Sequence, residues 1–200
     1  MSAGPVVERV YASLRERLLS GHYRPGQRLE VSELCDQLAS STTPVRDALN
    51  RLLGEGLVET PGREGFAAPG FDEPSLADLY RWSAELMRLS LAGGACAATA
   101  ATVDGALAYP EKVAALLAAA ASGSDNCEHG RAIAHVSARL WPVRSIEPEL
   151  LPDVESEFEE LQHLLQGNMT ARLRQALRRY HGRRIQRSSA LVRLLYRPRI

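Results

Sequence analysis

The side chains best suited to contact nucleic acid lie in the segment "SSTTPVRDALNRLLGEGLVET", residues 40–60. The guanidinium of Arg46 can donate two parallel hydrogen bonds to the acceptor edge of guanine, and the hydroxyls of Thr42 and Thr43 can donate to phosphates or bases. Asn50 and Arg51 follow one helical turn later. This pattern predicts a helix that enters a DNA major groove with its N-terminus first, where free N–H groups and the helix dipole favour phosphate.

Taken alone, a Thr-Thr-Pro start followed by an arginine also fits an ordinary capped helix with a solvated surface. The surrounding elements decide between the two interpretations. Apolar residues at helical spacing predict a first helix over residues 6–19 and a short second helix over residues 31–38. In the third helix, Thr42 or Thr43 is predicted to be the N-cap, and Pro44 suits the first turn because its missing N–H is not needed there.

A hairpin is predicted directly after the third helix. The segment "LVETPGREGFAAP", residues 57–69, reads as two short strands around a Pro-Gly turn. Arg63 and Gly65 lie at its tip, where a wing would pass near the minor groove or the DNA backbone. Helix, helix, tight turn, helix and hairpin make up the winged helix-turn-helix arrangement, so the pattern favours DNA binding.

Residues 10–66 resemble the DNA-binding domain of GntR-type bacterial transcription regulators without a gap. The match runs through "LRERLLSGHYRPGQRLEVSELCDQLASSTTPVRDALNRLLGEGLVET" and on to the glycine at the hairpin tip. In that family, the positions that match Ser32, Thr43, Arg46 and Gly65 contact DNA. The family usually has a basic residue where this chain has Thr42.

The second half of the chain is predicted to be all helical. Interruptions by Pro69, Gly70 and Pro74 predict a boundary, with a DNA-binding domain over residues 1–70 and a helical domain over residues 75–200. The overall fold class is therefore mainly α, a winged helix-turn-helix followed by a helical bundle. The predicted helices, the third ended by Pro142 and the last with a break near Gly182, span residues 75–101, 109–121, 128–141, 150–165 and 169–195.

This helical half resembles the FCD effector domain of FadR- and VanR-type regulators. Many such domains hold a divalent metal through one Asp and three His residues, and the metal helps to bind a small carboxylate. Here the usual Asp position is Arg131, although His135 matches one family His and His181 could match a later one. The resemblance therefore implies a degenerate metal site, and no cofactor is predicted; a retained divalent metal is the alternative.

An anionic effector is predicted instead of a metal-bound one. A guanidinium at Arg131 would repel a divalent ion but could bind a carboxylate directly in a bidentate pair. We expect the pocket to lie between the helices that carry Trp82, Arg131, His135 and Arg178, with His181 as a further candidate. The alternative is that the two histidines are ordinary core or surface groups.

The composition excludes several other functions. The net charge of the 200 residues is zero, so any nucleic-acid surface must be a local cluster. Three widely spaced cysteines argue against disulfides or a zinc site, and no secretory or membrane-spanning pattern is evident, so a cytoplasmic location without membrane contact is expected. No arrangement typical of a catalytic nucleophile, phosphate loop or carboxylate pair stands out, so we predict no enzyme.

These observations predict a homodimeric transcriptional regulator, more often a repressor in this family, whose partner is a double-stranded DNA operator. The alanine-rich helices from Leu89 to Ala121 could supply dimer contacts, and a small organic-acid effector would shift operator binding. Two alternatives stay open: a regulator whose effector pocket is lost, and a helical metal-binding or catalytic domain with a vestigial DNA-reading domain.

Overall fold

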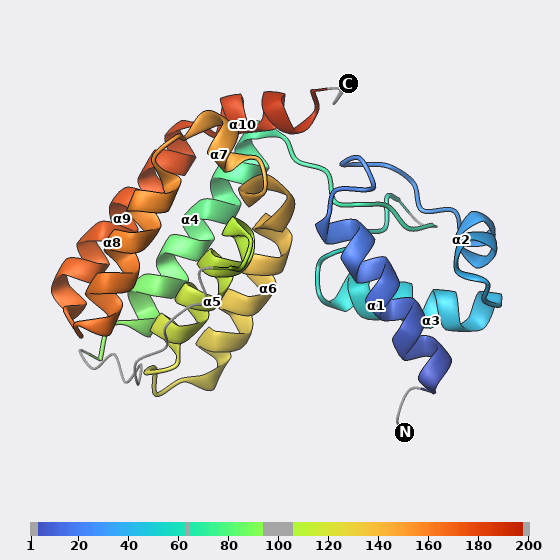
Figure 1. Ribbon diagram of the computed structural model, residues 1–200, viewed down its shortest axis with the longest axis horizontal. Coiled ribbons are helices and arrows are strands. Elements are labelled where there is room, and N and C mark those ends of the chain that lie inside the picture. The colour runs from blue at the N-terminus through green and yellow to red at the C-terminus, as the bar shows by residue number, and fades with distance from the viewer. Residues whose placement is uncertain (1–3, 63–64, 94–105, 198–200) are drawn as a thin grey trace. The chain divides into compact units, whose positions relative to one another are not determined.

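The computed structural model describes residues 4–62, 65–93 and 106–197. The chain divides into two compact units, Met1–Phe71 and Asp72–Ile200, each considered by itself below (Figure 1). The predicted fold class is confirmed: both units are mainly helical, and the first has the winged helix-turn-helix order.

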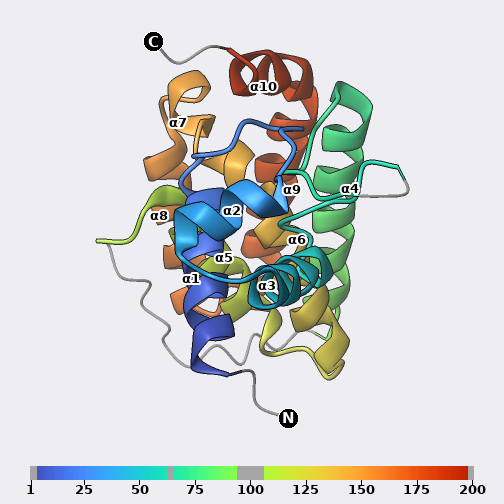
Figure 2. The same ribbon diagram turned by 90° about the vertical axis from the view of Figure 1, so that its right-hand side faces the viewer.

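The N-terminal unit is built around three helices. They are α1 (Pro5–Leu19), α2 (Val31–Leu38) and α3 (Thr42–Gly54), so the first two begin and end almost where the apolar spacing predicts. Both α1 and α2 pack against α3 (Figure 2). The shared core is apolar and consists of Val10, Leu14, Leu18, Leu34, Leu38, Val45, Ala48, Leu49, Leu52, Leu57 and Val58.

A tight turn sets the angle between α2 and α3. Ala39 caps the C-terminus of α2 in the left-handed region, with φ of 45°, and its N–H bonds back to the carbonyl of Asp36. Only Ser40 and Ser41 then separate this turn from the start of α3. A left-handed alanine is strained because its Cβ crowds the following carbonyl, so the packing of the two helices must hold it there.

The predicted hairpin is present in minimal form. Glu59 and Ala67 exchange both backbone hydrogen bonds, at 2.9 and 2.8 Å, and Ala67 also forms an antiparallel bridge with Arg28. The described residues thus form isolated bridges rather than named strands. They still join the segment before α2 to both arms of the wing, which fixes the wing beside the helices.

The helical unit contains seven helices among its described residues. They are α4 (Glu73–Ser90), α5 (Tyr109–Ala121), α6 (Cys127–Arg144), α7 (Glu147–Leu150), α8 (Val154–Gln166), α9 (Thr170–Gln186) and α10 (Ser188–Leu195). Helix α4 lies centrally and packs against α5, α6, α9 and α10, with α9 running beside it (Figures 1 and 2). It starts with a capping box in which the N–H of Ser75 donates to Asp72 at 2.8 Å.

Two proline predictions in this unit are wrong. Helix α6 continues through Pro142 to Arg144, because the buried side chains of Leu140 and Val143 on either side hold the last turn in place. The single helix predicted over residues 150–165 is two helices. Pro152 disfavours a helical conformation at the residue before it, so α7 ends at Leu150 and α8 starts after the turn.

Two helix ends also differ from the prediction. The first long helix ends at Ser90 rather than 101, and the rest of that predicted segment overlaps residues 94–105, which lie outside the described residues. Helix α9 passes through Gly182 without a break and ends at Gln186. A helical glycine costs about 1 kcal/mol relative to alanine, and the buried neighbours His181 and Arg184 offset this.

Within the described part of the chain, no helix combines the length and the apolar character that crossing a bilayer requires.

Candidate nucleic-acid interface and polar core

One face of α3 is exposed and polar. Thr42, Thr43, Arg46 and Asn50 are all exposed, and Thr42, Arg46 and Asn50 recur four residues apart on the same face of the helix. The buried residues of α3, from Val45 to Leu52, lie on another face and pack into the core. The amphipathic pattern therefore directs the predicted base-contacting side chains to solvent.

The start of α3 is open. The N-cap is Ser41, not Thr42 or Thr43 as predicted, and its side chain makes no capping hydrogen bond. Both threonines are the first residues of the helix itself and are exposed. Since the first-turn N–H groups are not capped by a side chain, they can donate to an incoming phosphate. Pro44 has no N–H and occupies the third helical position, where none is needed.

The two arginines of α3 differ in what they contact. Arg46 makes no hydrogen bond or ion pair with any described residue. Arg51 is held within the domain: its guanidinium lies 2.7 Å from Glu8 of α1 and stacks 3.7 Å from the ring centroid of Tyr11. Burial and the carboxylate of Glu55, which accepts from the Tyr11 hydroxyl at 2.7 Å, raise the pKa of Tyr11. Arg51 thus ties α1 to α3, and of the two arginines only Arg46 can extend towards a partner.

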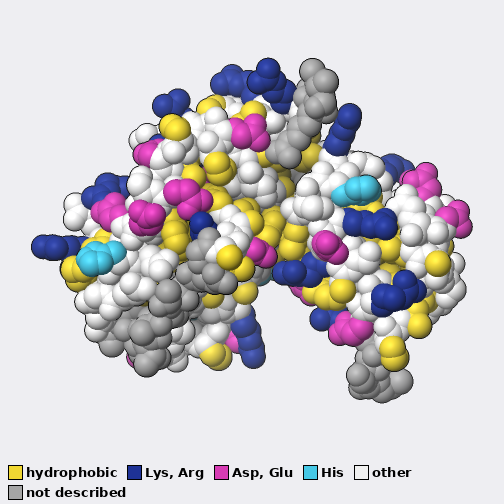
Figure 3. Space-filling view, viewed as in Figure 1, with side chains coloured by type: hydrophobic (Ala, Val, Ile, Leu, Met, Phe, Trp, Pro, Cys, Tyr) yellow, Lys and Arg dark blue, Asp and Glu magenta, His cyan; other side chains and the backbone are white. Residues whose placement is uncertain are grey.

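The remaining predicted contacts surround this face in part. Ser32 is exposed near the start of α2, and Gly65 is exposed on the wing with φ of 94°. That left-handed conformation favours glycine, which explains the residue type there. Arg63 lies outside the described residues. Basic and acidic side chains alternate over the view of Figure 3, so no broad basic sheet covers the drawn face.

The predicted effector residues do not converge on one pocket, which corrects that part of the sequence interpretation. Trp82 of α4 is 50% exposed. The side chain of Arg131 on α6 is 76% exposed and pairs with Glu128 at 2.5 Å. Half-buried His135 has a lowered pKa because of burial and the nearby Arg139. An expectation of charge in the core pointed to the wrong arginine, because Arg131 lies on the outer face of its helix.

Arg178 and His181 line a small hollow between α4 and α9. Its lining consists of Ala84, Met87, Arg88, Leu91, Arg174, Leu177, Arg178 and His181, and its free volume is about 20 Å³. Two of the arginines are engaged, since Arg88 pairs with Glu85 at 2.8 Å and Arg174 donates to the carbonyl of Leu91. Arg178 has no polar partner among the described residues. The hollow has space for about one water molecule.

His181 is a neutral core residue. Its Nδ1 lies 2.7 Å from the carbonyl of Leu177, which can only accept, so Nδ1 carries the proton. Nε2 then accepts from the Ser83 hydroxyl at 3.0 Å. Burial, with smaller contributions from Arg144 and Arg184, lowers the pKa of His181 to about 3. Both ring nitrogens are therefore engaged, and none of the described His, Cys, Asp and Glu side chains form a group of three or more that could hold a metal ion.

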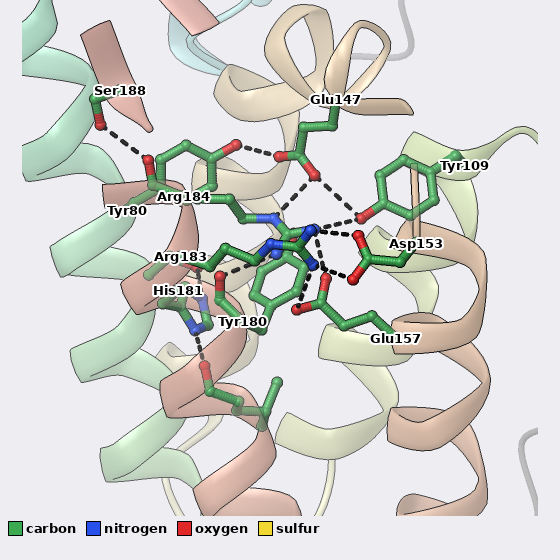
Figure 4. A network of polar contacts seen from close by, with 12 residues as sticks. Tyr80, Tyr109, Glu147, Asp153, Glu157, Tyr180, His181, Arg183, Arg184 and Ser188 are labelled. Carbon is green, nitrogen blue, oxygen red and sulfur yellow. Dashed lines mark hydrogen bonds and ion pairs between the residues drawn. The ribbon is translucent and has the colours of Figure 1, made fainter. Parts of the chain in front are cut away.

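A buried polar network crosses the core of the helical unit (Figure 4). Glu147 and Arg184 are both fully buried and pair at 2.9 Å. Glu147 also accepts hydrogen bonds from the hydroxyls of Tyr80 and Tyr109. Arg184 stacks 3.5 Å from the ring centroid of Tyr180. The network thereby joins α4, α5, α7 and α9, and a buried pair of this kind is held by its additional hydrogen bonds.

The outer edge of the network is closed by a second arginine. Arg183 grips Asp153 with both terminal nitrogens and lies 3.9 Å from Glu157, which in turn pairs with Arg184 at 2.8 Å (Figure 4). The hydrogen bond from Arg183 lowers the pKa of Asp153. Sequence reasoning assigned most arginines of this helix to a solvated face, and so it missed that Arg184 faces the core.

Arg144 is the second fully buried arginine, and sequence reasoning missed it as well. Its exposure is 0%. None of its three guanidinium nitrogens has a hydrogen-bond partner among the described residues, and the same holds for the hydroxyls of Tyr180 and Ser137. No motif marks it, although the apolar residues around it in "LWPVRSI" would have placed it on a buried stretch.

Comparison with known proteins bears on the N-terminal unit most directly. Residues 6–67 match the family described as "Bacterial regulatory proteins, gntR family". The chain is 46% identical over 68 residues to the Nta operon transcriptional regulator of Aminobacter aminovorans, covering 34% of this chain and 32% of that protein. It is 31% identical over 84 residues to the HTH-type transcriptional repressor GlaR of Escherichia coli, covering 41% and 38%. These matches span about a third of each curated relative.

Solved structures resemble the chain over nearly its full length. E. coli McbR/YncC superimposes with a TM-score of 0.64 at 20% identity, covering 95% of this chain and 99% of that one. A GntR-type putative transcriptional regulator from Rhodococcus sp. RHA1 gives a TM-score of 0.70 at 20% identity, covering 92% and 97%. At this identity, the likeness establishes the fold of the two units.

Proposed function

We propose that this chain, whose N-terminal domain belongs to the GntR family of bacterial regulatory proteins, is a homodimeric, sequence-specific DNA-binding transcriptional regulator. In this proposal, α3 lies in the major groove of a double-stranded operator, the wing follows the backbone, and the FCD-like helical domain dimerises and responds to a small anion. Repression is the favoured outcome, as the curated relative GlaR is named a repressor.

The observation that carries the DNA-binding proposal is the exposed, unpaired Arg46 on an open helix start. Its guanidinium has no intramolecular partner among the described residues, so no ion pair has to break before it reaches a base edge. Thr42 and Thr43 flank it at the end where phosphate is favoured. Arg51 is a support between α1 and α3 in this scheme, not a base contact.

The test is binding to an operator found by footprinting the DNA that flanks the chain's own gene. Arg46→Ala is expected to lose about 1–3 kcal/mol of specific binding and to relax the preference at one base pair. Arg131→Ala, which removes the same charge from the helical domain, is the control and should bind as the wild type does. Equal binding by Arg46→Ala and wild type would refute the assignment.

The homodimer proposal is supported by the exposed face of α4. Trp82 is 50% exposed and Leu89 is 38% exposed, and both lie on the face that also carries Asp78 and Glu85. Large apolar side chains that share one face of a helix are typical of an interaction surface. The occupant we propose is α4 of a second copy, in antiparallel orientation across a two-fold axis.

The charges on α4 are arranged symmetrically for such pairing. Asp78 and Arg88 are equidistant in sequence from position 83, and Arg81 and Glu85 are too. Across a two-fold axis at that level, each arginine would face a carboxylate of the partner, and Trp82 would lie next to the axis. Within one chain, the exposed pairs Arg81–Asp78 and Arg88–Glu85, at 2.6 and 2.8 Å, already orient these side chains.

The effector proposal is that a small carboxylate shifts the population of dimer states that fit the operator. It is supported by the arginines that the helical domain places around the hollow and in its core. A ligand can shift such an equilibrium only by its differential affinity for the two states. The effector arm is tested by comparing operator affinity with and without candidate organic acids; affinity unchanged by all of them would leave a regulator without an effector.

A further inference from the structure

The most unusual group in the helical domain is the guanidinium of Arg144. A guanidinium carries five N–H donors and no acceptor, and in water all five are solvated. Here the side chain is fully buried and none of its nitrogens meets an acceptor among the described residues. Buried donors without partners are costly, and such a group in a native protein calls for water, an ion or a ligand.

The neighbouring acceptor is already occupied. Glu147 is the carboxylate whose charge acts on Arg144. Its Oε1 accepts from the Tyr80 hydroxyl, and its Oε2 accepts from Tyr109 at 3.1 Å and from Arg184 at 2.9 Å. A carboxylate with these partners has little capacity left for a second arginine. The Glu147–Arg184 pair and the tyrosines therefore form a completed network that leaves Arg144 out.

Two further groups near this network are unsatisfied. The Tyr180 hydroxyl is fully buried without a hydrogen bond, and so is the hydroxyl of Ser137, which precedes Arg144 by seven residues on the same face of α6. Hydroxyls can donate, so together with Arg144 the core holds an excess of donors over acceptors. The missing component is an acceptor.

We propose that the core of the helical domain binds a small monocarboxylate, whose two oxygens accept a bidentate pair of hydrogen bonds from Arg144, with the Tyr180 hydroxyl as a further donor. A carboxylate is acceptor-only, planar and matched to the guanidinium fork. The adjacent Glu147 disfavours a dianion such as phosphate. Arg144 and Arg184 together disfavour a metal ion, and their positive field also acts on His181, whose pKa both arginines lower in addition to burial.

This site deepens the proposed effector function and rests on it only for its biological role, because carboxylate binding is measured without DNA. The experiment records the melting temperature of the full chain against sodium acetate, with sodium chloride at matched ionic strength as the salt control. Wild type is expected to show a saturable rise with acetate and none with chloride. The matched variant Arg131→Met, altered in the exposed arginine of the same helix, is expected to respond as wild type does.

Arg144→Met keeps the length and apolar stem of the side chain but removes every donor. It is expected to lose the acetate response, with an apparent affinity about 10-fold to 100-fold weaker. In acetate-free buffer it should melt at the same temperature as wild type or higher, since the unsatisfied donors are gone. An acetate response equal to that of wild type would overturn the proposal.

A structural role for Arg144 gives a different pattern. If ordered water satisfies the guanidinium, Arg144→Met will melt well below wild type and acetate will not stabilise wild type; this result also overturns the proposal. Should Arg144→Met fail to fold, Arg144→Lys and the wild-type side-chain NMR spectrum decide. Acetate must shift the Nε–H signal of Arg144, and Arg144→Lys, which keeps the charge but not the fork, must bind acetate more weakly; an unmoved signal refutes the site.

Discussion

The two domains keep their arginines in opposite places. In the N-terminal domain, the core is apolar and the unpaired Arg46 stands on an exposed helix face. In the helical domain, Arg144 and Arg184 are fully buried, and the paired arginines Arg81 and Arg88 stand outside. An exposed guanidinium is available to a partner as large as DNA, whereas a buried one is available only to groups within the protein or to a small molecule. The contrast separates a DNA-reading domain from a domain suited to sensing.

The largest expected effect concerns the buried network, where the contrast between domains is strongest. Glu147→Gln leaves Arg184 buried without its charged partner and should lower the free energy of unfolding of the helical domain by about 3–5 kcal/mol. Chemical denaturation measures it. Asp153→Asn, in the exposed pair with Arg183, is the control and should change stability little. A small effect of Glu147→Gln would show that the network does not stabilise the core.

The second prediction concerns pH. The folded-state pKa of His181 is about 3, below the unfolded value of about 6.5, so the unfolded chain binds an additional proton between these values. The associated stability is fully present above pH 6.5 and is lost as the pH falls towards 3, with a slope of at most about 1.4 kcal/mol per pH unit. Denaturation of wild type and His181→Gln across this range should show a flatter profile for the variant; identical slopes would contradict a buried neutral His181.

The third prediction sharpens the role of the exposed arginines of α4. Arg81→Glu should weaken the dimer about 10-fold, because the introduced carboxylate would face Glu85 of the partner subunit. Arg81→Glu combined with Glu85→Arg should recover dimerisation, although the charge pairs within each helix remain broken. Sedimentation of both variants, with Arg131→Glu as a control, measures the dissociation constant. A double variant as weak as the single one would place the interface elsewhere.

The smallest expected effect concerns the turn that aims α3. Ala39 adopts φ of 45°, which glycine adopts without a Cβ clash. Ala39→Gly should stabilise the N-terminal domain by about 0.5–1 kcal/mol, after the greater unfolded-state freedom of glycine is allowed for. Thermal unfolding measures it, and a destabilised variant would show that the left-handed turn is not strained.

Sequence reasoning was most successful where local rules govern. The first two helices begin and end close to the predicted residues because apolar spacing and a short turn decide them, and the wing follows from its Pro-Gly turn. It failed where tertiary contacts override local preferences. Buried neighbours carry α6 through Pro142 and α9 through Gly182.

The candidate sites divide in the same way. The exposed face of α3 follows from helical periodicity, so its predicted members lie together, except that Arg51 turns towards Glu8 and Tyr11 of α1. The core site depends on which face of a helix meets its neighbours. Helical spacing alone did not distinguish exposed Arg131 from buried Arg144, although they lie on the same helix. A buried arginine has no sequence signature until its partners are known.

The most direct test of the account is the specific operator affinity of wild type and Arg46→Ala at one fixed salt concentration, each compared with its affinity for unrelated DNA. If Arg46 reads a base, the variant keeps its affinity for unrelated DNA apart from one charge contact, and its preference for the operator falls by about 1–3 kcal/mol. If the preference for the operator is unchanged, then the exposed face of α3 does not read DNA sequence, and the central claim is wrong.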